Sequence, residues 1–392
     1  MNFKDEAKAL SPYIMTQRRY LHAHPELSFA EKETTAYVAK ELEAMGLQVQ
    51  RFADYNGLLA EVVGAKPGKK VLLRADIDAL PITEDSGVEF TSQNPGVMHA
   101  CGHDSHTAML LAATKMLIAH KAELAGTVQL LFQSAEESGH GSKYYVDKKL
   151  VTDAEACFAL HVMPQVEAGH LVVEHGPRMA SCTDFIATIE GTSAHGSTPH
   201  LGKDAIVAAS AAIMNVQALV SRVNNPLIPL VVTIGKMRAG KQFNIICDKV
   251  VMDGTIRTFD QTVYKEMPQR LARIIEQTAQ MYQCTSKMEY ITDEPVTDNC
   301  HPELVTLAQQ AAINLWGDNI LASADSLMGS EDFSIIMDKV PGVIAFLGIK
   351  DAKAIYPLHN EHFCFDDSNL YLGAGLYAQF AWDYLQGGGA HV

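Results

Sequence analysis

The chain has 392 residues, of which 47% are apolar and 20% charged, a composition typical of a folded globular protein. A chain of this length is too long for one ordinary hydrophobic core, so we expect two domains. Its 46 acidic residues outnumber its 31 basic ones, and the formal net charge of −15 argues against nucleic acid or an anionic membrane as a partner. The acidic start does not resemble a secretory signal and no apolar stretch reaches spanning length, so a cytoplasmic location is expected.

The amino-terminal part of the chain predicts alternating helices and strands. A helix over Glu31 to Met45 ends at Gly46, a residue suited to the C-cap. Apolar spacing predicts a further helix over Asp104 to His120. Short segments rich in Val and Leu predict buried strands at Leu47 to Phe52, Leu58 to Val63, Val71 to Ile77 and Val128 to Phe132. This alternation predicts an α/β sheet.

From about Thr183 the pattern changes to that of a self-contained α+β unit. It comprises four predicted strands and two predicted helices: Phe185 to Glu190, Leu230 to Lys236, Lys249 to Phe259 and Ser286 to Ile291, with helices Lys203 to Val223 and Thr262 to Tyr282. Asp293 to Pro295 is a plausible return linker, after which the apolar segment Gly342 to Gly348 belongs with the first sheet. We therefore predict one domain of residues 1–182 and 294–392, with residues 183–293 inserted into it.

The segment from Met98 to His106 concentrates potential metal ligands. It places Cys101, three histidines and Asp104 within nine positions, directly before a predicted helix. Thiolate and imidazole are good ligands for zinc and similar divalent metals, and a nearby carboxylate can orient a ligating histidine. A helix start with an Asp cap and buried histidines would read similarly, so this segment alone does not establish a metal site.

Two adjacent carboxylates, Glu136 and Glu137, follow the strand predicted at Val128 to Phe132. Ligands of open α/β sheets bind at the carboxyl ends of strands. One carboxylate of such a pair can bind a metal ion while its neighbour acts as general base. Taken alone, however, an acidic pair is more often a solvated turn.

Two more histidines complete the pattern. His161 is expected at the end of a second apolar run, and His359 lies in the segment from Tyr356 to Phe363. Either one alone is more often an ordinary core or surface histidine. Together with the first two segments they complete a Cys, His, Glu, His, His set, which is enough for two metal ions with an open position for water.

These segments resemble, in order and context, the amidohydrolase branch of the aminoacylase and carboxypeptidase metallopeptidase superfamily, which includes hippurate hydrolases, indole-acetyl-amino-acid hydrolases and N-acetyl-diaminopimelate deacetylases. The resemblance runs from His24-Pro25-Glu26-Leu27-Ser28, through Leu73 to Pro81, as far as His359. It implies a metal-dependent exopeptidase-like catalytic domain with an inserted lid or dimerisation domain, and two divalent ions, zinc or manganese. It implies this site: Cys101, His103, Glu137, His161 and His359 as metal ligands and Glu136 as general base.

The same resemblance gives the insert a role. It implies that His195 contacts the reacting carbonyl and that Asn244 and Arg257 bind the polar end of the substrate, although Arg257 fits a surface ion pair equally well. A homodimer through the insert is expected, in which His195 serves the partner's site. The segment Val231 to Ile234 supports this, because it alternates too little to leave one face fully solvated.

Other positions resemble the family less closely. Asp76 and Asp78 match a metal motif of distant relatives in which the first residue is His, so we expect both to support ligands rather than bind metal. The family often has Pro where Ser134 stands, and Gly-Gly where this chain has Ser193-Ala194. The segment Gly329-Ser330-Glu331-Asp332-Phe333 also matches, although as a bare sequence it fits a helix N-cap.

The expected reaction is hydrolysis of the N-acyl amide bond of an N-acyl amino acid or related small amide by metal-activated water. A carboxypeptidase or dipeptidase using the same site is the alternative. A non-catalytic metal-stabilised binding protein would not need Glu136. A two-metal phosphoesterase would favour more Asp ligands and basic phosphate clamps, and no Gly-x-Ser-x-Gly elbow suggests a serine nucleophile.

Overall fold

The structure is a computed structural model that describes residues 1–352 and 355–387. Its chain divides into two compact units. The first unit contains Met1–Gly176, Asp298–Asp325 and the described residues from Asp332 onward, and the second contains Pro177–Thr297 and Ser326–Glu331. The domain boundaries expected from the sequence, 182/183 and 293/294, stay a prediction.

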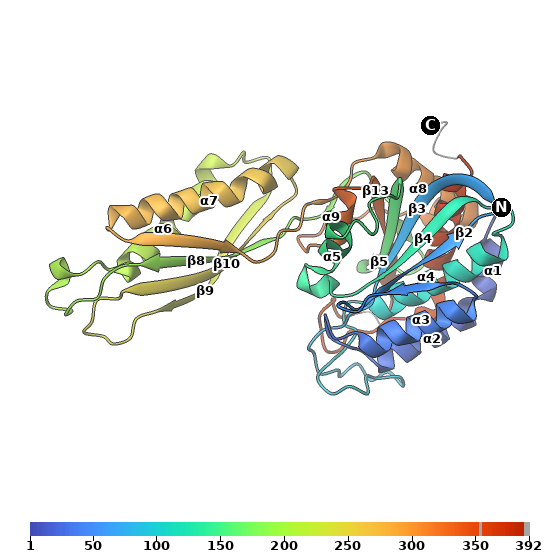
Figure 1. Cartoon of the computed structure of the whole chain (residues 1–392), viewed down its shortest axis with the longest axis horizontal. Helices are drawn as coiled ribbons and strands as arrows, with labels where there is room; N and C mark the ends of the chain where they lie inside the picture. Colours follow the sequence, from blue (N-terminus) through green and yellow to red (C-terminus); the bar gives the residue numbers. More distant parts are fainter. Residues whose placement is uncertain (353–354, 388–392) are drawn as a thin grey trace. The chain divides into compact units, whose positions relative to one another are not determined.

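The first unit is built on a seven-stranded mixed sheet in the order β1-β2-β4-β3-β5-β13-β6 (Figure 1). The central neighbours β4, β3, β5 and β13 are parallel, and the pairs at the edges are antiparallel. The strands are β1 (Val49–Arg51), β2 (Leu58–Val63), β3 (Lys66–Asp76), β4 (Ala125–Gln133), β5 (Ala156–Glu167), β6 (Leu171–Val172) and β13 (Gly342–Lys350). This arrangement confirms the predicted α/β class, because buried parallel strands carry the continuous apolar runs seen in the sequence.

Helices surround this sheet. They are α1 (Lys4–Ala9), α2 (Ser11–Ala23), α3 (Lys32–Ala44), α4 (His103–Ala119), α5 (Gly141–Asp147), α8 (Pro302–Trp316), α9 (Phe333–Met337) and α10 (Tyr371–Leu385). Helices α4 and α10 pack against each other and against β3, and both are buried along most of their length. The start of α4 is therefore held firmly at the carboxyl end of the parallel strands, where a site is expected.

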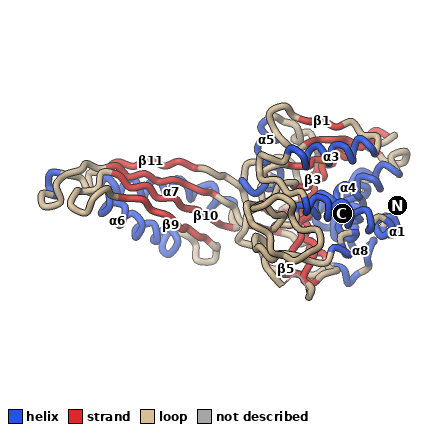
Figure 2. The backbone as a smooth tube through the Cα atoms, turned by 90° about the horizontal axis from the view of Figure 1, so that it is seen from below, coloured by secondary structure: helices blue, strands red, loops and turns tan. Residues whose placement is uncertain are grey.

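The second unit is a four-stranded antiparallel sheet in the order β11-β8-β10-β9, with two helices on one of its faces (Figure 2). Its elements are β8 (Thr183–Glu190), α6 (Ala205–Ala218), β9 (Leu230–Ala239), β10 (Lys249–Thr258), α7 (Gln261–Met281) and β11 (Thr285–Tyr290). The chain passes between the units at β7 (Gly176–Met179) and β12 (Thr297–Asn299), which pair as a two-stranded sheet, and again on either side of Ser326–Glu331.

Helix α6 buries one face and exposes another that is also apolar. Ala208, Ala212 and Val216 are fully buried, whereas Met214 is 70% exposed and Val207 46% exposed. Within the described residues, the stretch Ala205–Val223 is the one helical segment long and apolar enough to cross a membrane, judged by length and composition alone. Those same properties suit a helix that packs against another protein chain.

Two expectations about the insert need correction. The helix expected to run unbroken from Lys203 to Val223 ends as an α-helix at Ala218 and continues as a π-helical turn, Leu219–Val223. The segment 231–234 was expected to alternate too little, but Val232 is buried while Val231 is 40% exposed. The reason is that β9 is an edge strand in a unit whose helices cover one face of the sheet.

Candidate metal centre

The turn before α4 presents Cys101 and His103. Gly102 has φ 89°, in the left-handed region, and a Cβ added there would lie 2.4 Å from Val162 Cγ2 on β5. Only glycine tolerates both conditions at little cost. The turn thus lies tightly against β5 and buries Cys101 and His103 beside that strand.

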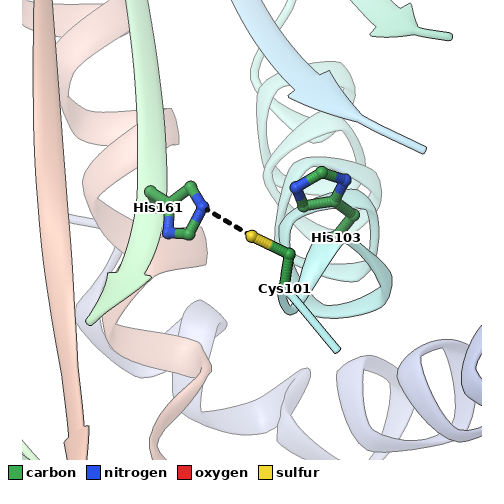
Figure 3. A group of neighbouring side chains, drawn as sticks. All are labelled: Cys101, His103 and His161. Carbon is green, nitrogen blue, oxygen red and sulfur yellow. Dashed lines mark hydrogen bonds between the residues drawn. The ribbon is translucent and has the colours of Figure 1, made fainter. Parts of the chain in front are cut away.

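The third side chain of this group comes from β5. His161 donates its Nδ1–H to the carbonyl of Val162 at 2.7 Å, which turns Nε2 toward Cys101 Sγ, 3.5 Å away (Figure 3). The ligand-type atoms of Cys101, His103 and His161 all lie within 4.8 Å of one another. A thiol and two imidazoles at this spacing form a group suited to a zinc-like ion.

A second group shares Cys101. The thiol lies within 4.8 Å of a Glu137 oxygen and a His359 ring nitrogen, and His359 Nε2 is 3.5 Å from Glu137 Oε2. A hydrogen bond of 2.8 Å from the His359 backbone N–H to the Ala100 carbonyl holds that loop beside the thiol. All five expected ligands therefore converge, in two groups with Cys101 common to both. Their roles as ligands stay a prediction.

Two observations show that this site fits metal ions. His103 Nε2 and Glu137 Oε1 are buried and have no hydrogen-bond partner among residues 1–352 and 355–387. Buried polar atoms without a partner are expensive, so something outside the chain is expected to contact these two. The donor set of thiol, imidazoles and carboxylate suits two divalent ions, which the two groups can hold.

The pKa values of the side chains in the cluster also indicate a site suited to cations. Burial raises the pKa of Glu137 to about 7, and burial together with Glu137 and Glu136 raises that of Cys101 well above its usual value. Burial lowers the pKa of His103, but Asp76, Asp78 and Glu137 outweigh it and raise the pKa to about 10. The raised pKa values favour the protonated forms of these groups, and metal binding at such sites releases protons.

Asp76 and Asp78 contact the histidines of the α4 start. Asp78 accepts from His103 Nδ1 through Oδ1 at 3.3 Å, and its backbone carbonyl lies 3.0 Å from the same nitrogen. Asp76 Oδ1 lies 2.7 Å from His106 Nδ1. His106 Nε2 in turn accepts the Val162 N–H at 3.0 Å, so both ring nitrogens are engaged and His106 is not a candidate ligand.

Glu136 lies at the edge of the cluster. It begins the short 3₁₀ turn Glu136–Ser138 directly after β4, as its position behind an apolar strand predicts. Its Oε2 is 3.8 Å from His103 Nε2, and its Oε1 accepts the Asp332 N–H at 3.4 Å. The carboxylate is thus near the cluster but is held by a separate donor.

The remaining predicted site residues lie in the second unit. His195 pairs with Ile245 in a β-bridge, and Gly196 N–H donates to the Asn244 carbonyl at 2.7 Å, so His195 and Asn244 are neighbours. Both are exposed. Arg257 lies at the carboxyl end of β10 and forms an ion pair with Asp184 at 3.4 Å.

Sequence reasoning missed two buried groups behind the cluster. Arg74, whose guanidinium lies 2.7 Å from Asp76 and 3.0 Å from Asp332, links two acids that flank the site. Glu31 hydrogen-bonds the turn that carries Glu136. The only signal for Glu31 was an acidic residue at the start of a predicted helix, which is ordinary at such a position.

Comparisons with known proteins identify the family of this chain. The model of peptidase family M20/M25/M40 matches residues 72–383. N-acetyl-L-cysteine deacetylase of Bacillus subtilis (strain 168) is 37% identical over 361 residues, covering 92% of this chain and 85% of that protein. Thermostable carboxypeptidase 2 of Saccharolobus solfataricus is 34% identical over 384 residues, covering 96% of this chain and 97% of that protein.

A solved structure shares the whole architecture. The crystal structure of Bacillus subtilis YXEP protein, described as a dinuclear metal binding peptidase from the M20 family, has a TM-score of 0.84 and 32% identity, covering 97% of this chain and 99% of that one. The family match, these relatives and the paired ligand groups agree. This chain belongs to peptidase family M20/M25/M40 and is a metal-dependent amidohydrolase.

Proposed function

We propose that the chain hydrolyses the N-acyl amide bond of N-acyl amino acids or related small amides. The observation that carries the proposal is the convergence of Cys101, His103, His161, Glu137 and His359 into two groups that share one thiol, with Glu136 beside them. Amide hydrolysis needs water activated at neutral pH and a stabilised oxyanion. This set of side chains supports both needs.

The residues divide the work as follows. Two divalent ions, held by the five ligands, would supply Lewis acidity toward water and the substrate carbonyl. Glu136, held by the Asp332 N–H, takes a proton from the attacking water and delivers it to the leaving nitrogen. His195 donates to the oxyanion; its Nδ1 accepts the Ser197 N–H at 3.1 Å, which leaves Nε2 to carry the proton in the neutral ring.

The proposed substrate contacts require two chains. Lys249 and Arg257 lie at opposite ends of β10, about 26 Å apart at roughly 3.3 Å per residue. His195 and Asn244 lie beyond the Lys249 end, because Lys249 pairs with Glu190 and the strand contact continues at His195. One small substrate cannot span that distance. If both groups bind it, they come from different subunits.

The second unit offers a surface for such a dimer. β9 is an edge strand with free pairing capacity, and α6 exposes Val207 and Met214. Exposed apolar surface beside an open sheet edge favours association with a second copy. We propose an isologous homodimer through this face, in which each subunit lends His195 and Asn244 to its partner.

A substrate panel tests the proposed reaction. Protein loaded with zinc or manganese is incubated with N-acetyl, N-benzoyl and N-indoleacetyl amino acids and with dipeptides, and amine release is measured. Release from the acyl amino acids is expected. Release only from dipeptides would favour the carboxypeptidase or dipeptidase alternative, which has support from the S. solfataricus relative. Metal preference is measured in the same panel, by comparing the zinc-loaded and manganese-loaded protein.

The cytoplasmic location expected from the sequence stays a prediction.

A further inference from the structure

The backbone that carries Glu136 is strained at one residue. Ala135, which is fully buried, has φ 61° and ψ 36°, in the left-handed region. For a residue other than glycine this conformation costs roughly 1 kcal/mol or more. It persists only where the surroundings impose it, so the groups that hold Ala135 also fix the direction in which Glu136 and Glu137 leave the strand.

The carboxyl group of Glu31 holds this turn from outside. Its Oε1 accepts the Ala135 N–H at 2.7 Å, and its Oε2 accepts the Ser134 hydroxyl at 2.8 Å. The Ala135 carbonyl is engaged within its own loop, accepting the Ser138 hydroxyl at 2.7 Å and the Gly141 N–H at 3.1 Å. Glu31 therefore connects the turn to another element, the start of α3.

Glu31 is itself held rigidly. It is completely buried, it precedes α3, and its backbone carbonyl accepts the Thr35 N–H at 3.0 Å. Asn56 Nδ2 donates to its Oε2 at 3.3 Å. These hydrogen-bond partners are all neutral, and burial together with Asp78 raises the pKa of Glu31 to about 7. A buried carboxyl without a cationic partner is a poor stabiliser of a fold, so stability alone does not account for it.

We propose that Glu31 is a positioning residue for the active site. Its carboxyl group clamps Ser134 and Ala135 so that the left-handed turn aims Glu137 at Cys101 and His359 and leaves Glu136 beside them. Ser134 takes part through its hydroxyl. The inference rests on the proposed function for the role of Glu136, whereas the role of Glu137 can be followed by metal binding alone.

Three variants and one control test the clamp. Glu31→Gln keeps an acceptor for the Ala135 N–H and a donor for the Ser134 oxygen, so it should retain most activity and metal affinity. Glu31→Ala removes both contacts, and loss of a group that orients metal ligands typically lowers affinity or activity roughly 10- to 100-fold. Ser134→Ala removes one hydrogen bond and should lower kcat roughly 3- to 10-fold.

The matched control is Val38→Ala. Val38 lies on α3, about two turns from Glu31, and its side chain is fully buried in the hydrophobic core of the first unit. It should destabilise the region while leaving kcat and metal affinity unchanged. Zinc affinity is measured by competition with a chromophoric chelator, kcat and KM by amine release, and folding by circular dichroism and Tm.

The expected pattern is a fall in kcat and zinc affinity for Glu31→Ala, with KM little changed and recovery in Glu31→Gln. Wild-type values of both quantities in folded Glu31→Ala would overturn the proposal, as would an equal loss in Val38→Ala. If Glu31→Ala does not fold, Ser134→Ala decides: unchanged kcat and zinc affinity overturn it. Zinc affinity remains informative if the wild type hydrolyses no N-acyl amino acid, which separates failure here from failure of the proposed reaction.

Discussion

Glu136 and Glu137 are adjacent and equally shielded, yet their neighbours differ. Each carboxylate is 10% exposed. Glu137 faces His359, and its backbone N–H donates to Asp78 at 3.0 Å, whereas Glu136 accepts the Asp332 N–H. Environment, rather than residue type, therefore separates the proposed ligand from the proposed base.

This difference in environment predicts that the same Glu-to-Gln substitution will affect kcat at one position and metal content at the other. Glu136→Gln should keep the metal content and lower kcat roughly 10²- to 10⁴-fold, because the amide preserves shape but cannot take a proton. Glu137→Gln should lower metal content, because a neutral amide is a weaker ligand. Elemental analysis and amine release are measured on both variants. Full metal occupancy in Glu137→Gln, or a near-normal rate in Glu136→Gln, contradicts the assignment.

The residues that meet in the cluster could be named from the sequence because their segments resemble those of a known family, whereas His161 taken alone would pass for an ordinary core histidine. Cys101 and His103 are two positions apart, and Glu136 and Glu137 are contiguous. Glu31 could not be predicted, because its partners Ser134 and Ala135 lie more than a hundred residues away and bind it through hydrogen bonds that leave no sequence pattern. Likewise, no sequence pattern showed that the Val162 N–H donates to His106 Nε2 and so removes that nitrogen as a metal ligand.

At the scale of elements, long periodic segments were predicted well and their ends less so. The helix expected over Asp104 to His120 is α4, His103–Ala119. His161 was expected at the end of an apolar run, but β5 continues to Glu167 because it pairs with β13 as far as Lys350. Pairing between distant segments decides where a strand ends, and a local pattern does not contain that information.

One element prediction concerns Glu294, which lies on the return path from β11 and pairs with Cys182 in a β-bridge. It is 4% exposed, and burial raises its pKa to about 7. The folded chain thus binds a proton more tightly than the unfolded chain between the usual pKa and 7, so stability falls as pH rises through that interval. The destabilisation above pH 7 is on the order of 3 kcal/mol, from about 2.5 pKa units at about 1.36 kcal/mol each.

Glu294→Gln removes this ionisation. Calorimetry should show a higher Tm than the wild type at pH 8 and little difference at pH 4.5. Glu276→Gln, at a solvent-exposed position on α7, is the control and should leave the pH dependence unchanged. An equal change in Tm at both pH values for Glu294→Gln would show that packing, and not ionisation, is responsible.

At the scale of the whole molecule, the proposed shared site predicts complementation. Glu136→Gln and His195→Ala subunits are each expected to be inactive. In a mixed dimer, the site with intact Glu136 receives His195 from its partner, so part of the activity should return. Amine release is measured after the two variants are mixed and exchanged.

Two further variants control this experiment. Met214→Glu places a charge on the exposed face of α6 and should give monomers that do not complement, as measured by sedimentation and activity. Met281→Glu changes an equally exposed methionine at the end of α7 and should have no effect. Mixed dimers that form and stay inactive would contradict the shared site.

The paired strands β7 and β12 lie at two of the points where the chain passes between the two units. All five proposed ligands and Glu136 belong to the first unit, and His195, Asn244 and Arg257 belong to the second. Substitutions around the proposed substrate contacts can therefore accumulate in the second unit while the residues of the proposed metal centre stay unchanged in the first.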